Sequence, residues 1–146
     1  MTTLTSRVAV PAPVEATAAV VLDLTRDREW RPAVTHMEVD PPGPARVGQR
    51  AVERLRVAGL TFVTPSEVVE AGPDGFAFEG GSRQMTLRGR RTVTAQPDGT
   101  SLVTEELTVV PHGLFRLVHP LLVPGYRRTM DADLARIPAV VAAQRV

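Results

Sequence analysis

The sequence predicts an α+β domain, in which an antiparallel sheet of about six strands is covered on one face by a long C-terminal helix. Between Val47 and Val110, apolar and polar residues alternate with a period of two, which is typical of strands. Turn signals such as Pro97-Asp98-Gly99 separate these runs, and short turns favour antiparallel pairing. After His112, the apolar residues recur at the spacing of a helix.

The N-terminal region predicts one strand followed by two short helices. Alternation over Thr5–Val10 indicates the strand, which Pro11 ends because proline cannot donate to a sheet ladder. Apolar residues at helical spacing then extend over Val14–Thr25. The charged stretch Arg26–Arg31 is interpreted as a short second helix that the following proline ends.

The predicted sheet turns one face toward water and the other toward the helix. In the run that begins at Val47, the residues Arg50, Arg54 and Arg56 occupy one set of alternate positions, so that set faces solvent. The expected strands after the helices cover Met37–Val39, Val47–Val57, Phe62–Ala71, Phe76–Glu79, Met85–Ala95 and Thr100–Val110.

The last third of the chain predicts the long helix. The apolar segment Leu114–Val123 is interpreted as a helical or irregular lead-in, and Pro124 is expected to start a helix that runs to about Ala143. Because proline lacks an N–H, Pro138 is expected to kink or shorten this helix. Its apolar stripe consists of Tyr126, Met130, Leu134, Ile137 and Val141.

Composition excludes several classes of function. The 146 residues suit one domain, and a net charge of +1 argues against an electrostatic hold on nucleic acid. The chain has no Cys and no Lys, so thiolate and lysine Schiff-base chemistry are both excluded. It has no apolar run of about 18 residues, so we expect no membrane span, and without a signal peptide we expect a cytoplasmic location.

We expect neither a metal nor a cofactor. His36, His112 and His119 do not have the spacing of a helical metal site, and there is no Cys to join them. Phosphate-loop, dinucleotide-binding and nucleophile-elbow motifs are also absent from the sequence.

Four stretches in order along the chain resemble the SRPBCC superfamily of START-like, or helix-grip, proteins, and its polyketide cyclase/dehydrase-like branch in particular. They are Val8-Ala9-Val10-Pro11-Ala12-Pro13-Val14-Glu15, Asp27-Arg28-Glu29-Trp30-Arg31-Pro32-Ala33-Val34, Arg46-Val47-Gly48-Gln49-Arg50 and Pro97-Asp98-Gly99-Thr100-Ser101-Leu102-Val103-Thr104. The resemblance implies a helix-grip fold over residues 1–146 as one START-like ligand-binding domain. In this fold, a curved antiparallel sheet of six to seven strands would wrap around the long C-terminal helix and leave a central apolar cavity. Two short helices would follow the first strand.

Three charged residues occupy positions that alternation turns inward, namely Glu53, Arg91 and Glu105. A buried charge is costly unless it is paired, so Arg91 is predicted to pair with Glu53 or Glu105. Such a group could act catalytically, with the arginine binding a carbonyl or enolate oxygen while a carboxylate moves a proton. The alternatives are an ion pair without chemistry, or a one-residue shift in register that places all three in solvent.

Tyr126 is a further catalytic candidate, because its hydroxyl could point into the cavity from the start of the long helix; a core role is the alternative. Trp30 is predicted either to lock the second helix onto the sheet or to line the cavity mouth. The other candidate ligand-binding residues are Leu55, Phe62, Phe76, Phe78, Leu87, Met130, Leu134 and Ile137.

These features predict a protein that binds a small, apolar or carbonyl-rich molecule, as a monomer or homodimer. One hypothesis is a cofactor-independent enzyme that assists cyclisation or dehydration, in which orientation supplies most of the rate. The alternative is a carrier or sensor that leaves a hydrophobic ligand unchanged. A third hypothesis is a protein-interaction module that uses Leu114–Val123, although packing of this segment under the sheet edge is the simpler interpretation.

Overall fold

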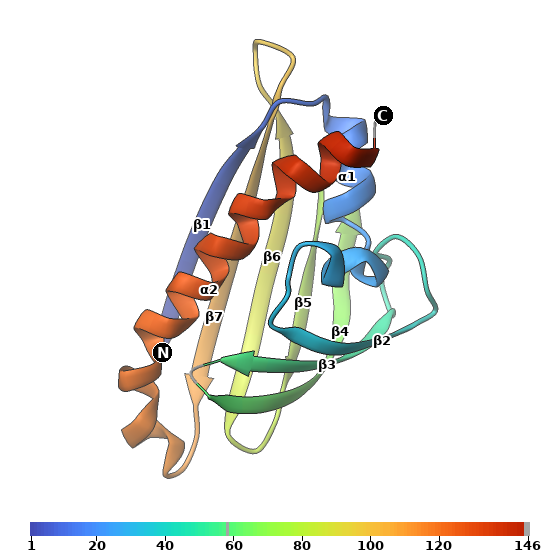
Figure 1. Cartoon of the computed structure of the whole chain (residues 1–146). Helices are drawn as coiled ribbons and strands as arrows, with labels where there is room; N and C mark the ends of the chain where they lie inside the picture. Colours follow the sequence, from blue (N-terminus) through green and yellow to red (C-terminus); the bar gives the residue numbers. More distant parts are fainter. Residues whose placement is uncertain (58, 145–146) are drawn as a thin grey trace.

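The alternating segments form one antiparallel sheet of seven strands in the computed structural model, which describes residues 1–57 and 59–144. The strand order is β1-β7-β6-β5-β4-β3-β2, and helix α2 crosses one face of the sheet (Figure 1). The elements are β1 Thr2–Val10, α1 Val14–Val21, η1 Leu24–Glu29, β2 Val34–Asp40, β3 Arg50–Val57, β4 Leu60–Gly72, β5 Gly75–Gly81, β6 Met85–Ala95, β7 Ser101–Pro111 and α2 Phe115–Gln144. This is the helix-grip α+β fold, as predicted.

The predicted division of the sheet into two faces is confirmed in β3. Its arginines are exposed, whereas Ala51 and Val57 are buried. The strand starts at Arg50 and not at Val47, which is 66% exposed. Gly48 explains the later start, because its φ of +89° lies in the left-handed region that breaks a strand.

The first helix is shorter than predicted and the second is a 3₁₀ helix. Helix α1 ends at Val21, and the side chain of Asp23 then accepts a hydrogen bond of 3.0 Å from the backbone N–H of Thr25. This bond caps η1, so the chain starts a new, tighter turn where the sequence predicted a continuing helix. In Figure 1, α1 lies at the upper end of the sheet beside the last turns of α2, and η1 follows below it, next to β2.

Helix α2 is longer than predicted at its start and is not ended by proline. It begins at Phe115, so the prediction that Pro124 starts it was wrong, and it continues past Pro138 to Gln144. Ile137 and Val141 are fully buried on either side of Pro138, and this packing holds the helix where one backbone hydrogen bond is lost. Within the described residues, no helix is long and apolar enough to cross a membrane.

Gly89 of β6 is predicted to be required for the shape of the inner face. A Cβ at this position would overlap the ring of Phe78 on β5, so Gly89→Ala should force that ring to turn and cost about 1–3 kcal/mol of unfolding free energy. Urea unfolding measures the effect. Gly72→Ala is the matched control, since a Cβ there meets nothing within 4 Å. Equal stability of the two variants would contradict the prediction.

Candidate functional site

A cavity of about 130 Å³ lies between the sheet and α2. Most of its wall is apolar, and it includes five of the residues predicted to bind ligand: Leu55, Phe62, Phe78, Leu87 and Met130. The polar part of the wall consists of Arg31, Glu53, Thr64, Ser66, Arg91, Glu105, Tyr126, Thr129 and Asp133. Ligand pockets commonly measure about 300–1,000 Å³, so this one fits a small, compact molecule.

Arg91 lies at the centre of a buried ion network on the polar side of the cavity. Its Nη1 donates hydrogen bonds to Asp27 Oδ1 at 2.9 Å and to the carbonyl oxygen of Val21 at 3.0 Å. Its Nη2 donates to Asp27 Oδ2 and Glu105 Oε1, both at 3.2 Å. The arginine side chain is 2% exposed and that of Asp27 is fully buried, so each neutralises the other out of contact with water.

Two of the predicted cavity residues pack against Arg91 and do not line the cavity. The arginine Cζ lies 4.7 Å from the ring centroid of Trp30 and 5.3 Å from that of Phe76, which is the range of a cation–π contact. Leu134 and Ile137 are also buried in the core, and none of these four side chains belongs to the cavity wall. Strand and helix periodicity identified them as buried but could not separate core from cavity.

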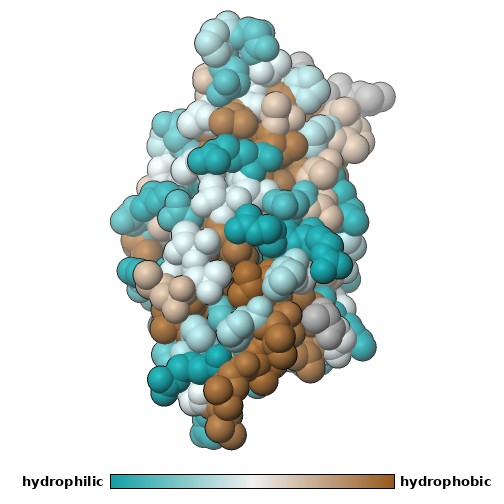
Figure 2. Space-filling view, turned by 90° about the vertical axis from the view of Figure 1, so that its left-hand side faces the viewer, coloured by the Kyte–Doolittle hydropathy of each residue, from teal (hydrophilic) through white to brown (hydrophobic). Residues whose placement is uncertain are grey.

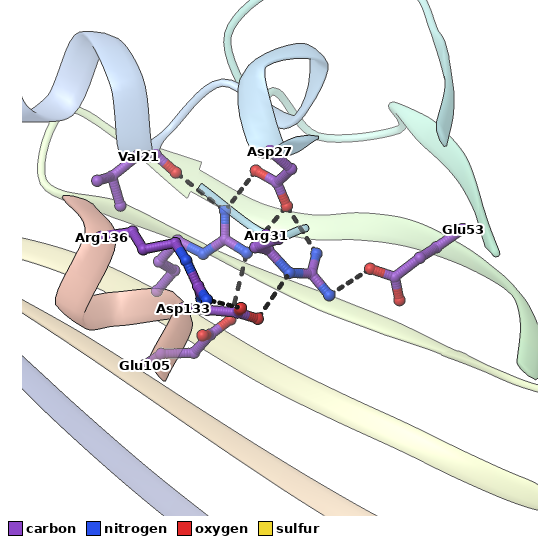
Figure 3. Close-up of polar contacts among 8 residues, drawn as sticks. Val21, Asp27, Arg31, Glu53, Glu105, Asp133 and Arg136 are labelled. Atoms are coloured by element: carbon purple, nitrogen blue, oxygen red, sulfur yellow. Dashed lines mark hydrogen bonds and ion pairs between the residues drawn. The ribbon is translucent and has the colours of Figure 1, made fainter. Parts of the chain in front are cut away.

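Arg31 is the second arginine of the network, and it links three carboxylates (Figure 3). It donates a hydrogen bond of 2.8 Å to Asp27 and forms an ion pair with Glu53. Its Nε lies 3.9 Å from Asp133 Oδ2. The prediction that Arg91 pairs with Glu53 or Glu105 is therefore correct for Glu105, whereas Glu53 pairs with Arg31.

Both arginines remain charged. Burial disfavours the charge of Arg31, but the negative charges of Glu53, Asp27 and Glu105 outweigh this effect and raise the pKa of Arg31. The same balance raises the pKa of Arg91, where burial is opposed by Asp27 and Glu105. Each arginine therefore carries a permanent positive charge at the polar end of the cavity, where carboxylates surround it.

Asp133 of α2 brings to the cavity a carboxyl group whose protonation changes near neutral pH. Burial raises its pKa from 3.8 to about 6; Arg31 opposes the rise and Glu105 adds to it. The carboxylate also accepts a hydrogen bond of 3.3 Å from Arg136. A carboxyl of this kind can both take and return a proton at physiological pH.

Tyr126 brings an unpartnered hydroxyl to the cavity wall. The hydroxyl is buried and forms no hydrogen bond with any other described residue. Burial raises the pKa of Tyr126 to about 12, so the group stays protonated and can donate. Its ring packs edge-on against Phe62 at 6.3 Å. A polar atom of a bound molecule would satisfy this donor.

Sequence reasoning missed Asp27, Arg31 and Asp133. A signal for Asp133 was present, because it follows Tyr126 by seven positions and Met130 by three and so lies on the buried face of α2. Asp27 and Arg31 gave no such signal, since they lie in a short charged stretch without a clear period. Within residues 1–57 and 59–144, no group of three or more His, Asp or Glu is arranged to hold a metal ion.

The seven-stranded sheet and the long helix that crosses it define a helix-grip protein, with a cavity between the two. A family model described as "Polyketide cyclase / dehydrase and lipid transport" matches residues 1–142. The chain belongs to this family, as the resemblance implied. No curated protein sequence matches the chain significantly.

Solved structures with the same fold include proteins named as aromatase/cyclases. Zhui aromatase/cyclase from Streptomyces sp. R1128 is 14% identical with a TM-score of 0.78, covering 99% of this chain and 96% of that one. The di-domain aromatase/cyclase BexL from the BE-7585A biosynthetic pathway is 18% identical with a TM-score of 0.73, covering 94% of this chain and 49% of BexL. TTHA0849 from Thermus thermophilus is 15% identical with a TM-score of 0.83, covering 99% and 100%. At these identities the likeness establishes the fold.

Removal of Arg91 is predicted to destabilise the protein strongly. Arg91→Leu leaves Asp27 buried with a charge that Arg31 alone must balance, and breaking a buried pair in this way costs about 3–5 kcal/mol. Urea unfolding gives the value. Arg90→Gln is the matched control, because this neighbouring arginine pairs with Glu70 on the exposed face and should cost less than about 1 kcal/mol. A similar loss of unfolding free energy in both variants would show that the buried ion pair stabilises the fold no more than the exposed one.

Asp133→Asn is predicted to change how stability depends on pH. The pKa of this carboxyl is about 6 in the folded protein and 3.8 ordinarily. Its ionisation therefore lowers the free energy of unfolding as the pH rises from 3.8 to about 6, and the lower value persists at higher pH. Asparagine cannot ionise. The variant should therefore gain up to about 3 kcal/mol relative to wild type between about pH 4 and pH 7.

Urea unfolding at a series of pH values tests this prediction. Asp131→Asn is the control for the loss of a carboxylate on α2, since it alters an exposed side chain two positions earlier that accepts a hydrogen bond from Ser6, and the gain should be larger in Asp133→Asn. A difference between Asp133→Asn and wild type that stays constant with pH would contradict the assignment.

Proposed function

We propose that this protein binds a small, apolar, carbonyl-bearing molecule in its cavity and assists the cyclisation or dehydration of that molecule without a cofactor. The observation that carries the proposal is the polar wall of Arg31, Asp133 and Tyr126 in an otherwise apolar cavity. This wall combines a permanent cation, a carboxyl that titrates near neutrality and a free hydroxyl donor.

Arg31 is proposed to hold the oxygen on which negative charge develops. Its Nη1 and Nη2 each contact one carboxylate, and its Nε is too far from Asp133 for a hydrogen bond. A guanidinium has five N–H donors, so some remain to bind a ligand oxygen. Arg91 is less suited to this role, because four hydrogen bonds occupy both of its terminal nitrogens. Positive charge fixed in place before reaction stabilises an enolate.

Asp133 is proposed to transfer the proton. As a carboxylate it takes a proton from the carbon beside a carbonyl group, and the enolate then attacks a second carbonyl of the same molecule. The carboxylic acid returns the proton to the new alkoxide, which becomes a hydroxyl. In a dehydration, Asp133 takes another proton from carbon and gives it to the departing hydroxyl, which leaves as water. No external oxidant or reductant is needed.

Tyr126 is proposed to orient the second carbonyl. Its protonated hydroxyl can donate one hydrogen bond, and Tyr126, Met130 and Asp133 follow one another along the buried face of α2. The predicted catalytic residues Glu53, Glu105 and Arg91 line the same cavity. In this proposal they are positioning residues, because their ion pairs fix Arg31 and Asp27 in place.

Two further facts support a cyclase-like role. The family includes polyketide cyclases and dehydrases by its description, and proteins named as aromatase/cyclases share the fold. The alternative function is a carrier or sensor of a hydrophobic ligand. The mutual neutralisation of charges within the network favours it, because such a wall can hold a polar atom without reacting with it.

The proposal predicts turnover of a short linear diketone whose aldol closure and loss of water give a cyclohexenone. The ultraviolet absorbance of the enone measures the rate. Arg31→Gln and Tyr126→Phe should each lower kcat/KM by about 100-fold, because each removes a donor to a reacting oxygen. Arg90→Gln, which alters the opposite face of the sheet, should keep wild-type activity.

Native mass spectrometry with the same diketone separates the two functions. Binding without any rate enhancement would overturn the catalytic proposal and support a carrier or sensor. Neither binding nor turnover would contradict both for this class of molecule. Turnover that survives Arg31→Gln and Tyr126→Phe would reject the assigned roles.

A further inference from the structure

Four apolar side chains at the start of α2 point into solvent. Leu114 is 84% exposed, Leu117 76%, Val118 42% and Leu121 81%. The last three follow Leu114 by three, four and seven positions, and this spacing places all four side chains on one side of a helix. We refer to these four residues as the leucine face. Figure 2 shows apolar residues gathered at the lower end of the molecule, where α2 begins in Figure 1. The expectation that this segment packs under the sheet edge therefore holds only for the side of the helix that carries Leu122, and it is wrong for the leucine face.

The opposite side of the same helical turns is firmly packed. Leu122 belongs to a buried cluster with Phe62 and Met85, and the ring of Phe115 lies 6.0 Å from that of Phe62. His119 is also buried, and it hydrogen-bonds to Thr2 at 3.1 Å. Because the other side of these turns is packed against the sheet, the orientation of the helix is fixed and the leucine face points into solvent.

This end of the molecule carries mainly positive charge, and the nearest carboxylate along α2 is Asp131, three positions after Arg128. The described sequence segments that meet there, 59–66, 80–87 and 107–130, contain no Asp or Glu. They contain Arg83, Arg116, Arg127 and Arg128, all exposed. Within the part of the chain that the structure describes, none of these four forms an ion pair. Arg128 follows Leu121 by seven positions and continues the leucine face.

We propose that this end of the molecule docks peripherally on a lipid bilayer that contains anionic lipids. The leucine face would enter the boundary between headgroups and acyl chains, and the arginines would contact the anionic headgroups. A second copy of the chain is a poorer occupant, because a symmetric contact would bring the same unpaired arginines together. An acidic protein is also a poorer partner. The three leucines project from the helix almost fully exposed, and they form no recess into which a side chain of a partner protein could fit.

Docking would place one end of the cavity at the bilayer. Phe62 and Met85 line the cavity, and Phe115 and Leu122 pack on the same cluster from the helix. The leucine face is on the other side of these turns. An apolar ligand dissolved in lipid would therefore lie one helix diameter from the cavity wall, about 10 Å.

Vesicle flotation tests the proposal with the intact protein. Wild type should float with vesicles of phosphatidylcholine and phosphatidylglycerol, and much less with phosphatidylcholine alone. Leu117→Gln/Leu121→Gln should lower the partition coefficient by about tenfold for each leucine. Arg116→Gln/Arg128→Gln should lower it by roughly fivefold for each arginine, on anionic vesicles only. Val47→Gln/Val69→Gln is the matched control, because it removes exposed apolar side chains elsewhere and should bind as wild type does.

Three outcomes would overturn the proposal. The first is no flotation with anionic vesicles, and the second is equal flotation with both vesicle types. The third is a dimer in sedimentation velocity that Leu117→Gln/Leu121→Gln dissociates, which would assign the leucine face to a second copy. Thermal unfolding of each variant confirms that a loss of binding is not a loss of fold. The test does not depend on turnover, so its result is separate from that of the cyclase proposal.

Discussion

The ion pair between Arg91 on β6 and Asp27 on η1 joins the sheet to the segment that follows α1. Neither side chain reaches water, and an unpaired charge in such a place would cost several kcal/mol, so each residue fixes the position of the other. Arg91 also holds the carbonyl of Val21 at the end of α1, and the ring of Trp30 packs on its guanidinium. The ion pair therefore ties the short helices to the sheet, beside the cavity that lies between the sheet and α2.

This tie also sets the chemistry of the cavity. Arg31 lies four residues after Asp27, and so it enters the polar wall and shares that carboxylate with Arg91. Two arginines then face four carboxylates, from Asp27, Glu53, Glu105 and Asp133. Asp133 Oδ2 lies 3.9 Å from the Nε of Arg31, and burial raises the pKa of Asp133 to about 6. Asp133 is thus the member of the network proposed to transfer the proton.

Helix α2 has different neighbours in its first and second parts. From Tyr126 onward, its inner side carries the phenol, Met130 and Asp133 to the cavity, and its last turns fill the core. Before Tyr126, its inner side closes the apolar end of the cavity and its outer side carries the leucine face. The two proposals, ligand chemistry and docking on lipid, therefore concern successive parts of one helix, and Phe115 packs against Phe62 between them.

The sequence by itself determined the strands, their inward and outward faces and the family, because alternation and turn residues are local properties that a fold must respect. It also placed Glu53, Arg91 and Glu105 on the inner face. Only the tertiary structure decided which charges meet, since Asp27 and Arg91 are 64 positions apart and no local period links them. It also decided that Trp30 belongs to the core and Asp133 to the cavity, because both positions are equally buried and differ only in what packs opposite them.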